Sequence, residues 1–107
     1  MVIKIERTER HLVVQAGSTT LRLDKESSKA SLQRKLLFWA RKPIERPLND
    51  IVSVNVDANV DRASGVELCA PTLVMRDGSA WALPHTDRTD ATKTASVVGS
   101  FLGIAVA

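Results

Sequence analysis

Apolar and polar residues alternate with a period of two through most of the first 84 residues of the chain. This alternation is typical of β-strands that bury one face and expose the other. The clearest run is Val52–Val60, where valines and one alanine hold the even positions and Ser, Asn and Asp hold the odd ones. Turn residues interrupt the pattern at regular intervals. The sequence therefore predicts a mainly β chain of antiparallel strands between about residues 2 and 84.

Turn chemistry sets the expected strand boundaries. We expect strands near residues 2–7, 12–16, 19–24, 30–46 (two strands), 52–60 and 66–75. In the 30–46 region, a connection around Trp39–Lys42 would join the two strands, with Pro43 and Pro47 confined to an edge or a strand end. The first ten residues are open to three interpretations: an additional strand, an edge added to a neighbour, or a loose tail.

The pair Asp77-Gly78 lies between two strand-like runs and predicts a β-hairpin. Asp and Gly tolerate the positive φ angles that a two-residue hairpin turn needs. A turn of that length would place Met75 opposite Ala80 and Val74 opposite Trp81.

The period changes after Pro84. Ala91, Ala95, Val98 and Leu102 recur at spacings of four, three and four, so one stripe of a helix is apolar. We expect this amphipathic helix over about residues 88–102, with N-cap candidates before it and Gly103 as its stop. A glycine inside a helix costs about 1 kcal/mol relative to alanine, so Gly99 indicates close approach to a neighbouring surface.

Length and composition limit the class of protein. A chain of 107 residues has the size of one domain, and 44% apolar with 25% charged residues is typical of globular proteins rather than disordered ones. A single cysteine excludes an internal disulfide and a cysteine-based zinc site. The N-terminus is charged from Lys4 onward and lacks the apolar region of a secretory signal, so we expect a cytoplasmic location.

Several segments together resemble a known family. They are Thr20–Asp24, Ala30–Lys35, Leu37–Phe38, Ile44–Ile51, Leu73–Gly78 and Val98–Gly103. This order resembles small bacterial pleckstrin-homology-like (PH-like) domains over roughly residues 12–104. The resemblance implies a single PH-like domain over 1–107, with two near-orthogonal antiparallel sheets of about seven strands forming a barrel capped by one C-terminal helix. It carries over no catalytic residue, and such domains elsewhere bind phosphoinositides, peptides or partner proteins.

The formal charge of +3 conceals an asymmetry along the chain. Residues 1–50 carry 11 Lys and Arg against 6 Asp and Glu, whereas residues 51–107 carry 4 against 6. We therefore single out one candidate surface for an anionic ligand or a partner. It comprises Lys29, Arg34, Lys35, Trp39, Arg41, Lys42 and Arg46. Such cations attract anionic partners if they converge in space. The alternative is a solvated hairpin whose charges discourage edge aggregation.

Other polar residues give weak functional signals. His11 and His85 have no neighbouring nucleophile motif, and nothing near Cys69 favours a reactive thiol. The row containing Asp57 and Asp61 lacks the central glycine and terminal glutamate of a calcium loop. We therefore expect no catalytic residue, no metal site and no cofactor.

The sequence thus favours a non-enzymatic interaction module that binds a protein partner or associates with itself. The alternative is a peripheral module at the inner face of the membrane, where the basic segment would contact anionic lipids. Nucleic acid is disfavoured because stacking surfaces need more aromatic residues than the two Trp and two Phe present here.

Overall fold

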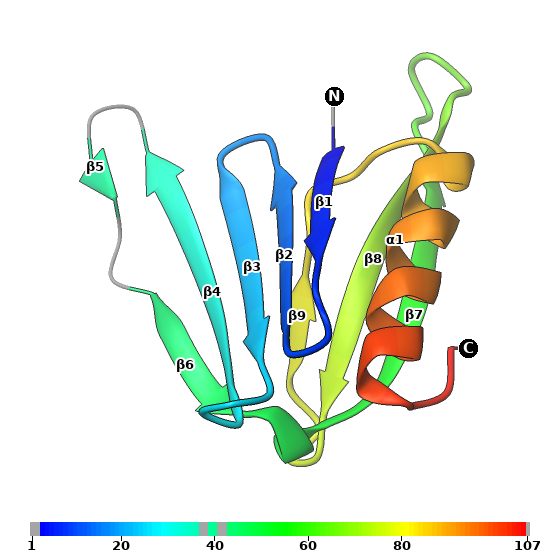
Figure 1. The fold of residues 1–107 in the computed structure, drawn as a ribbon. Coiled ribbons are helices and arrows are strands. Elements are labelled where there is room, and N and C mark those ends of the chain that lie inside the picture. Colours follow the sequence, from blue (N-terminus) through cyan, green and yellow to red (C-terminus); the bar gives the residue numbers. More distant parts are fainter. Residues whose placement is uncertain (1–2, 37–38, 41–42, 107) are drawn as a thin grey trace. The chain divides into compact units, whose positions relative to one another are not determined.

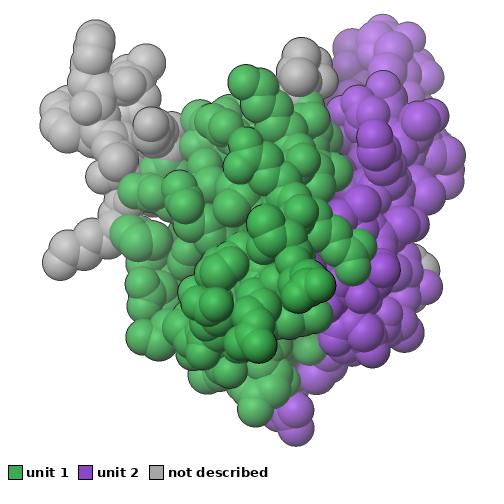
Figure 2. Space-filling model, viewed as in Figure 1, with its two compact units in different colours: residues 1–51 green, residues 52–107 purple. Residues whose placement is uncertain are grey.

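The computed structural model describes residues 3–36, 39–40 and 43–106. The chain divides into two compact units, Met1–Ile51 and Val52–Ala107, which Figure 2 colours separately. Across the described residues the fold is mainly β with one C-terminal helix, as the sequence predicts (Figure 1). No helix in those residues is both long enough and apolar enough to cross a membrane.

The first unit is built on an antiparallel sheet. Its elements are β1 (Ile3–Arg7), β2 (His11–Ala16), β3 (Thr19–Asp24), β4 (Lys29–Leu36), β5 (Trp39–Ala40), β6 (Ile44–Pro47) and the 3-10 turn η1 (Leu48–Asp50). The order is β1-β2-β3-β4-β5, and β6 also pairs with β4 (Figure 1). β1 therefore lies at an edge of this sheet. Residues Ile3–Arg7 form a strand that pairs with β2 and are not a loose tail.

Alternating burial shows why these segments are strands. Leu12 and Val14 in β2, Leu21 and Leu23 in β3, and Leu32 in β4 are all buried. Residues at the intervening positions, such as Gln15 and Arg22, are exposed. Burying each of these side chains contributes about 1.5–3 kcal/mol, so the period-two pattern fixes which face of the sheet is covered.

A tight turn sets the register between β2 and β3. Gly17 adopts φ +58°, and Ala16 pairs with Thr19 directly across the turn. Because antiparallel pairing then proceeds residue by residue, His11 at the start of β2 lies opposite Asp24 at the end of β3.

The second unit joins a three-stranded antiparallel sheet to the helix. Its strands are β7 (Ile51–Val60), β8 (Glu67–Met75) and β9 (Ala80–Ala82), in the order β7-β8-β9, and the helix is α1 (Arg88–Leu102). The helix packs on β8 and buries the apolar residues Ala91, Ala95, Val98 and Phe101. Its bounds match the range that the helical periodicity indicates.

Both ends of α1 are capped. The Asp87 carboxylate accepts a hydrogen bond from the Asp90 N–H at 2.7 Å, which satisfies one of the free donors of the first turn. Gly103 ends the helix in the left-handed region at φ +68°.

The prediction about Gly99 is confirmed. A Cβ at this position would meet the Val106 side chain, which lies in the segment after the helix. This segment returns along β7, where the Val54 N–H donates to the Ala105 carbonyl at 3.2 Å and Val54 pairs with Val106 in a parallel bridge. Gly99 therefore gives the C-terminal segment room to cross the helix.

The predicted register of the Asp77-Gly78 hairpin is wrong by one residue. Val74 lies opposite Ala80 and Leu73 opposite Trp81, while the Met75 N–H donates to the Ser79 carbonyl at 2.8 Å. The loop is longer than two residues because Asp77 Oδ1 accepts from both the backbone N–H and the hydroxyl of Ser79. Gly78 takes the left-handed position at φ +90° that such a loop needs.

The alternation in β7 predicts the strand but only part of its burial. Val54 is fully buried, whereas Val52 and Val60 are 43% and 62% exposed. The last four residues of the strand, Asp57–Val60, are all exposed. The pattern therefore identifies the strand, but the last four residues extend beyond the covered part of its sheet.

Candidate functional site

The structure distributes the predicted basic segment over several strands. Lys29 begins β4 opposite Pro47, and Arg34 lies five residues later opposite Thr19. Five residues of strand span about 17 Å, and an odd spacing places the two side chains on opposite faces of the sheet. Lys29 and Arg34 therefore do not belong to one patch.

Lys29 is instead brought near Arg46. Both residues line a shallow pocket of about 390 Å³ together with Ser27, Ser28, Glu45 and Pro47. Arg46 Nη1 also lies 4.0 Å from Oδ2 of Asp50, four residues further along the chain. The Arg46 charge is therefore partly compensated within its own unit.

The rest of the predicted surface is described only in part. In the backbone, Lys35 pairs with Ala40 and Leu36 pairs with Trp39, which joins β4 to β5. Arg41 and Lys42 lie outside the described residues.

A polar face covers the β1–β4 side of the first unit. One cross-strand row runs Lys4, Gln15, Thr20 and Gln33, and a second runs Glu6, Val13, Arg22, Ser31 and Glu45. Two pockets of about 300 and 250 Å³ open on this face and share Val13 and Arg22 in their linings. Lys4 is the charged residue of the first row, whereas the second row carries Glu6, Arg22 and Glu45, so the face does not present one sign of charge.

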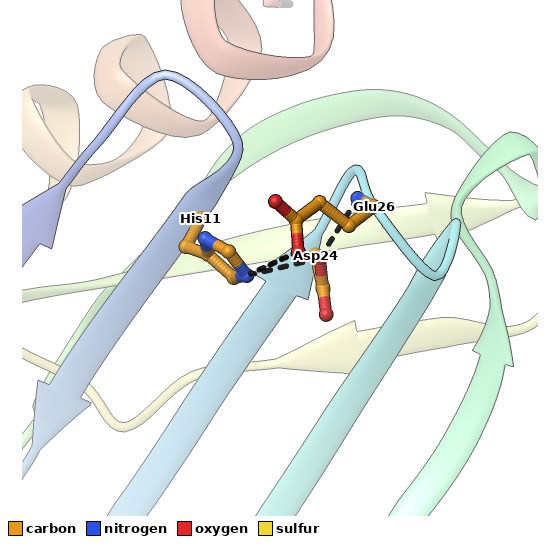
Figure 3. A group of neighbouring side chains, drawn as sticks. All are labelled: His11, Asp24 and Glu26. Carbon is orange, nitrogen blue, oxygen red and sulfur yellow. Dashed lines mark hydrogen bonds and ion pairs between the residues drawn. The ribbon is translucent and has the colours of Figure 1, made fainter.

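His11 and Asp24, which line the 250 Å³ pocket, form a group of three neighbouring side chains with Glu26 (Figure 3). His11 Nε2 lies 3.2 Å from Asp24 Oδ1 and 3.9 Å from Glu26 Oε2. In Figure 3 the imidazole from β2 and the two carboxylates from the end of β3 and the following turn point toward one another. One potential ligand atom from each residue lies within 4.8 Å of the other two.

Local hydrogen bonds fix this group. Asp24 Oδ1 accepts from the Glu26 N–H at 2.8 Å, which holds the turn that carries Glu26. On the other side, the His11 N–H donates to Thr8 Oγ1 at 3.0 Å. The Lys25 N–H donates to the Arg10 carbonyl at 2.7 Å and links the two turns.

The same contacts favour the ionised form of Asp24. Burial acts to raise the pKa of this carboxyl, but hydrogen bonds from Glu26 and Ser27 and the positive charge available on His11 outweigh it, so the pKa is lowered. Hydrogen bonds to a carboxylate stabilise its charged form. Asp24 is therefore an anion at neutral pH.

A different surface lies at the end of the β7–β8 hairpin. Val60, Val66 and Leu68 are 62%, 53% and 38% exposed, and they lie on either side of one turn. Figure 1 shows this turn extending past the first turn of α1. We refer to Val60, Val66 and Leu68 as the apolar tip.

The turn that carries the apolar tip is held by a dense set of hydrogen bonds. The Asp61 N–H donates to the Val66 carbonyl at 2.9 Å, and the Gly65 N–H donates to the Asp61 carbonyl at 2.7 Å. The Asp61 carboxylate accepts from the Ala63 N–H and the Ser64 hydroxyl. Gly65 adopts φ +71°, which closes the turn. The exposed valines are thus presented by a defined backbone.

At the start of β8, Glu67 and Arg88 form an ion pair. Arg88 Nε donates to Glu67 Oε1 at 2.7 Å, and Arg88 Nη2 donates to Glu67 Oε2 at 2.8 Å. The hydrogen bonds from Arg88 lower the pKa of the Glu67 carboxyl. The Glu67 carboxylate in turn raises the pKa of the Arg88 guanidinium. Both carboxylate oxygens of Glu67 therefore have a partner.

Cys69 lies beside this pair but is not activated by it. The thiol is buried and free, and its Sγ lies 3.7 Å from Glu67 Oε1. Burial and the neighbouring Glu67 carboxylate raise the pKa of Cys69. The thiolate is the nucleophilic form of cysteine, so this environment opposes nucleophilic chemistry.

Comparison with protein-family models, curated proteins and solved structures finds no match to this chain. The functional argument therefore rests on the chain's own residues.

Sequence reasoning did not bring His11, Asp24 and Glu26 together. The signal was nevertheless present in the Gly17-Ser18 turn: once Ala16 is paired with Thr19, counting outward places His11 opposite Asp24. Glu26 follows from the turn that an Asp at a strand end commonly forms with the N–H two residues later.

Proposed function

We propose that this chain is a non-enzymatic, PH-like interaction module that binds a protein partner or a second copy of itself. The antiparallel sheets followed by one C-terminal helix support the PH-like interpretation. The observation that carries the interaction proposal is the apolar tip, in which three large apolar side chains are exposed around one hydrogen-bonded turn. Exposed apolar groups that gather in one place are typical of interaction surfaces.

The charged groups around the tip suit a protein interface. Asp61 is held by the turn itself, and Glu67 is paired with Arg88. In the sequence Asp61 follows Val60 and Glu67 lies between Val66 and Leu68, so these apolar residues have charged neighbours, as the apolar centre of a protein interface has a polar rim. The raised pKa of Cys69 opposes a nucleophilic role for this thiol.

The proposal is tested with the variant Val60→Thr/Val66→Thr, which keeps β-branched side chains but replaces a methyl group with a hydroxyl at two exposed positions. Val52→Thr is the matched control, because Val52 is an exposed valine at the opposite end of the same strand. Self-association that weakens at least about tenfold in the double variant and persists in the control supports the proposal, since a tenfold change requires only ~1.4 kcal/mol.

Sedimentation with anionic vesicles tests the lipid alternative. Capture that falls steeply as salt rises, and that is lost when Lys29, Arg34, Lys35, Arg41 and Lys42 are replaced by Gln, would favour the membrane function instead. Neutral vesicles serve as the control. The separation of Lys29 from Arg34 on opposite faces leads us to expect no such capture.

A further inference from the structure

We propose that His11, Asp24 and Glu26 form a binding site for a divalent transition-metal ion such as Zn²⁺. The group lies in the first unit, far in sequence from the apolar tip, and the inference does not depend on the proposed interaction function. It also differs from the sequence-based expectation that the chain has no metal site.

The three donor types suit this class of cation. Neutral imidazole nitrogen and carboxylate oxygen both ligate Zn²⁺ at about 2.0–2.2 Å. Calcium and magnesium instead prefer all-oxygen sites, so the presence of His11 favours a transition metal. Asp24 supplies a carboxylate oxygen that is already oriented, because its Oδ1 accepts hydrogen bonds from the backbone N–H groups of Glu26 and Ser27.

The spacing of the donor atoms matches a coordination sphere. In a tetrahedral site with metal–ligand distances of about 2.1 Å, neighbouring ligand atoms lie about 3.4 Å apart. The distances from His11 Nε2 to Asp24 Oδ1 and Glu26 Oε2 are 3.2 and 3.9 Å. All three donor atoms lie within 4.8 Å of one another, so side-chain rotations can place them on one ion.

The backbone prepares this arrangement before any ion binds. His11 and Asp24 are paired across β2 and β3, so the sheet itself holds two of the donors opposite each other. The turn hydrogen bond from the Glu26 N–H to Asp24 Oδ1 positions the third. Ligands held in place before binding lose less conformational entropy when the ion arrives.

The adjoining pocket leaves room for the rest of the coordination sphere. Its volume of about 250 Å³ is lined by His11, Asp24, Ser31 and the cations Arg22 and Lys29, and Lys29 pairs with Asp24 across β3 and β4. Three protein ligands beside open space are typical of sites that keep one position for water or another small ligand. Two carboxylates and a neutral imidazole would leave a Zn²⁺ site electrically neutral.

The ion pair between a protonated His11 and the two carboxylates is the competing explanation for the cluster. A metal ion and a proton compete for the same Nε2 lone pair, so both cannot occupy it. The two explanations therefore differ in whether Zn²⁺ binds with one-to-one stoichiometry through His11.

Isothermal titration calorimetry of the full chain with Zn²⁺ at neutral pH separates them. We expect one Zn²⁺ per chain, with affinity reduced at least about tenfold in His11→Gln and in Glu26→Gln. His85→Gln is the matched control, since His85 is also exposed but belongs to the second unit, and it should bind as the wild type does. Mg²⁺ should bind at least about tenfold more weakly than Zn²⁺.

Circular dichroism of each variant confirms that the fold is retained; both substituted side chains are exposed, and neither accepts the turn hydrogen bonds made by Asp24. The absence of Zn²⁺ binding by the wild type would overturn the proposal. Unchanged Zn²⁺ affinity in both His11→Gln and Glu26→Gln, or its loss in His85→Gln, would overturn it as well.

Discussion

The two units expose different kinds of surface. The first unit carries a formal charge of +5 and the second −2, from 11 cations against 6 anions and 4 against 6. Among the described residues, Ile44 is the strongly exposed large apolar residue of the first unit, whereas the second has Val52, Val60, Val66, Leu68 and Val106. Among the described side chains, most of the exposed large apolar residues thus belong to the unit with the smaller formal charge, and charge alone does not locate an interface.

The carboxylates of the two units differ in a similar way. Glu67 has both oxygens engaged by one guanidinium, so it completes a contact within the second unit. Asp24 and Glu26 instead face an imidazole at the end of a pocket. A saturated ion pair contributes to the fold, whereas the open group has room for a ligand.

The largest expected effect is a loss of stability when a buried valine of the second unit is replaced by Asp, compared with the same change at an exposed valine. Val98 is 1% exposed on the helix face that packs on β8, and Val98→Asp should destabilise the protein by about 4 kcal/mol or more, because it buries an unpaired charge. Val60→Asp, at a 62% exposed position, should cost about 1 kcal/mol or less. Urea denaturation measures both, and similar losses would contradict the assignment of Val60 to the surface.

A smaller effect is expected where α1 meets the C-terminal segment. Gly99→Ala gains about 1 kcal/mol of helix propensity but places its methyl group against Val106. Crowding of this kind costs about 1–3 kcal/mol, so we expect a net destabilisation of roughly 1 kcal/mol. The second substitution Val106→Ala should restore the stability, and failure to do so would show that the close contact is not the cause.

The ion pair of the second unit predicts a pH dependence. The pKa of Glu67 is lowered from its ordinary 4.5, so its contribution to stability is complete above pH 4.5 and is lost as pH falls through the lowered pKa. The difference in urea midpoint between wild type and Arg88→Gln should therefore be constant near neutral pH and shrink in acid. A difference that grows on acidification would contradict this sign.

The smallest effect is expected from the charges of the first unit. Lys29→Gln/Arg34→Gln should change the self-association constant less than about twofold, because the two side chains lie on opposite faces of β4 and form no common surface. Light scattering over a range of concentrations measures this constant. A tenfold decrease in the self-association constant would contradict an interface at the apolar tip and would indicate one at the basic strands.

The sequence predicts the secondary-structure elements better than it predicts the register of their pairing or the burial of their faces. Period-two alternation finds β2 and β3, and helical spacing finds α1, because both patterns follow from backbone geometry. The Met75 register is missed because the Asp77 carboxylate, rather than the backbone, determines the loop length. The exposure of Val60 is also missed, since alternation shows that a face is apolar but not that anything covers it.

The candidate sites were predictable to different degrees. Counting from the Gly17 turn is enough to pair His11 with Asp24, so that part of the metal cluster is accessible from sequence. The separation of Lys29 from Arg34 follows from strand parity once β4 is known to run through both residues. The contribution of Glu26 depends on the direction of an exposed side chain, which no periodicity determines.

The mass of the purified protein in solution, measured by light scattering across a dilution series, tests the central claim most directly. For self-association through the apolar tip we predict a concentration-dependent mass above that of one 11.7 kDa chain, which Val60→Thr/Val66→Thr returns to the monomer value and Val52→Thr leaves unchanged. A mass of one chain at every concentration would contradict self-association. An assembly unaffected by the double variant would contradict the role of the apolar tip.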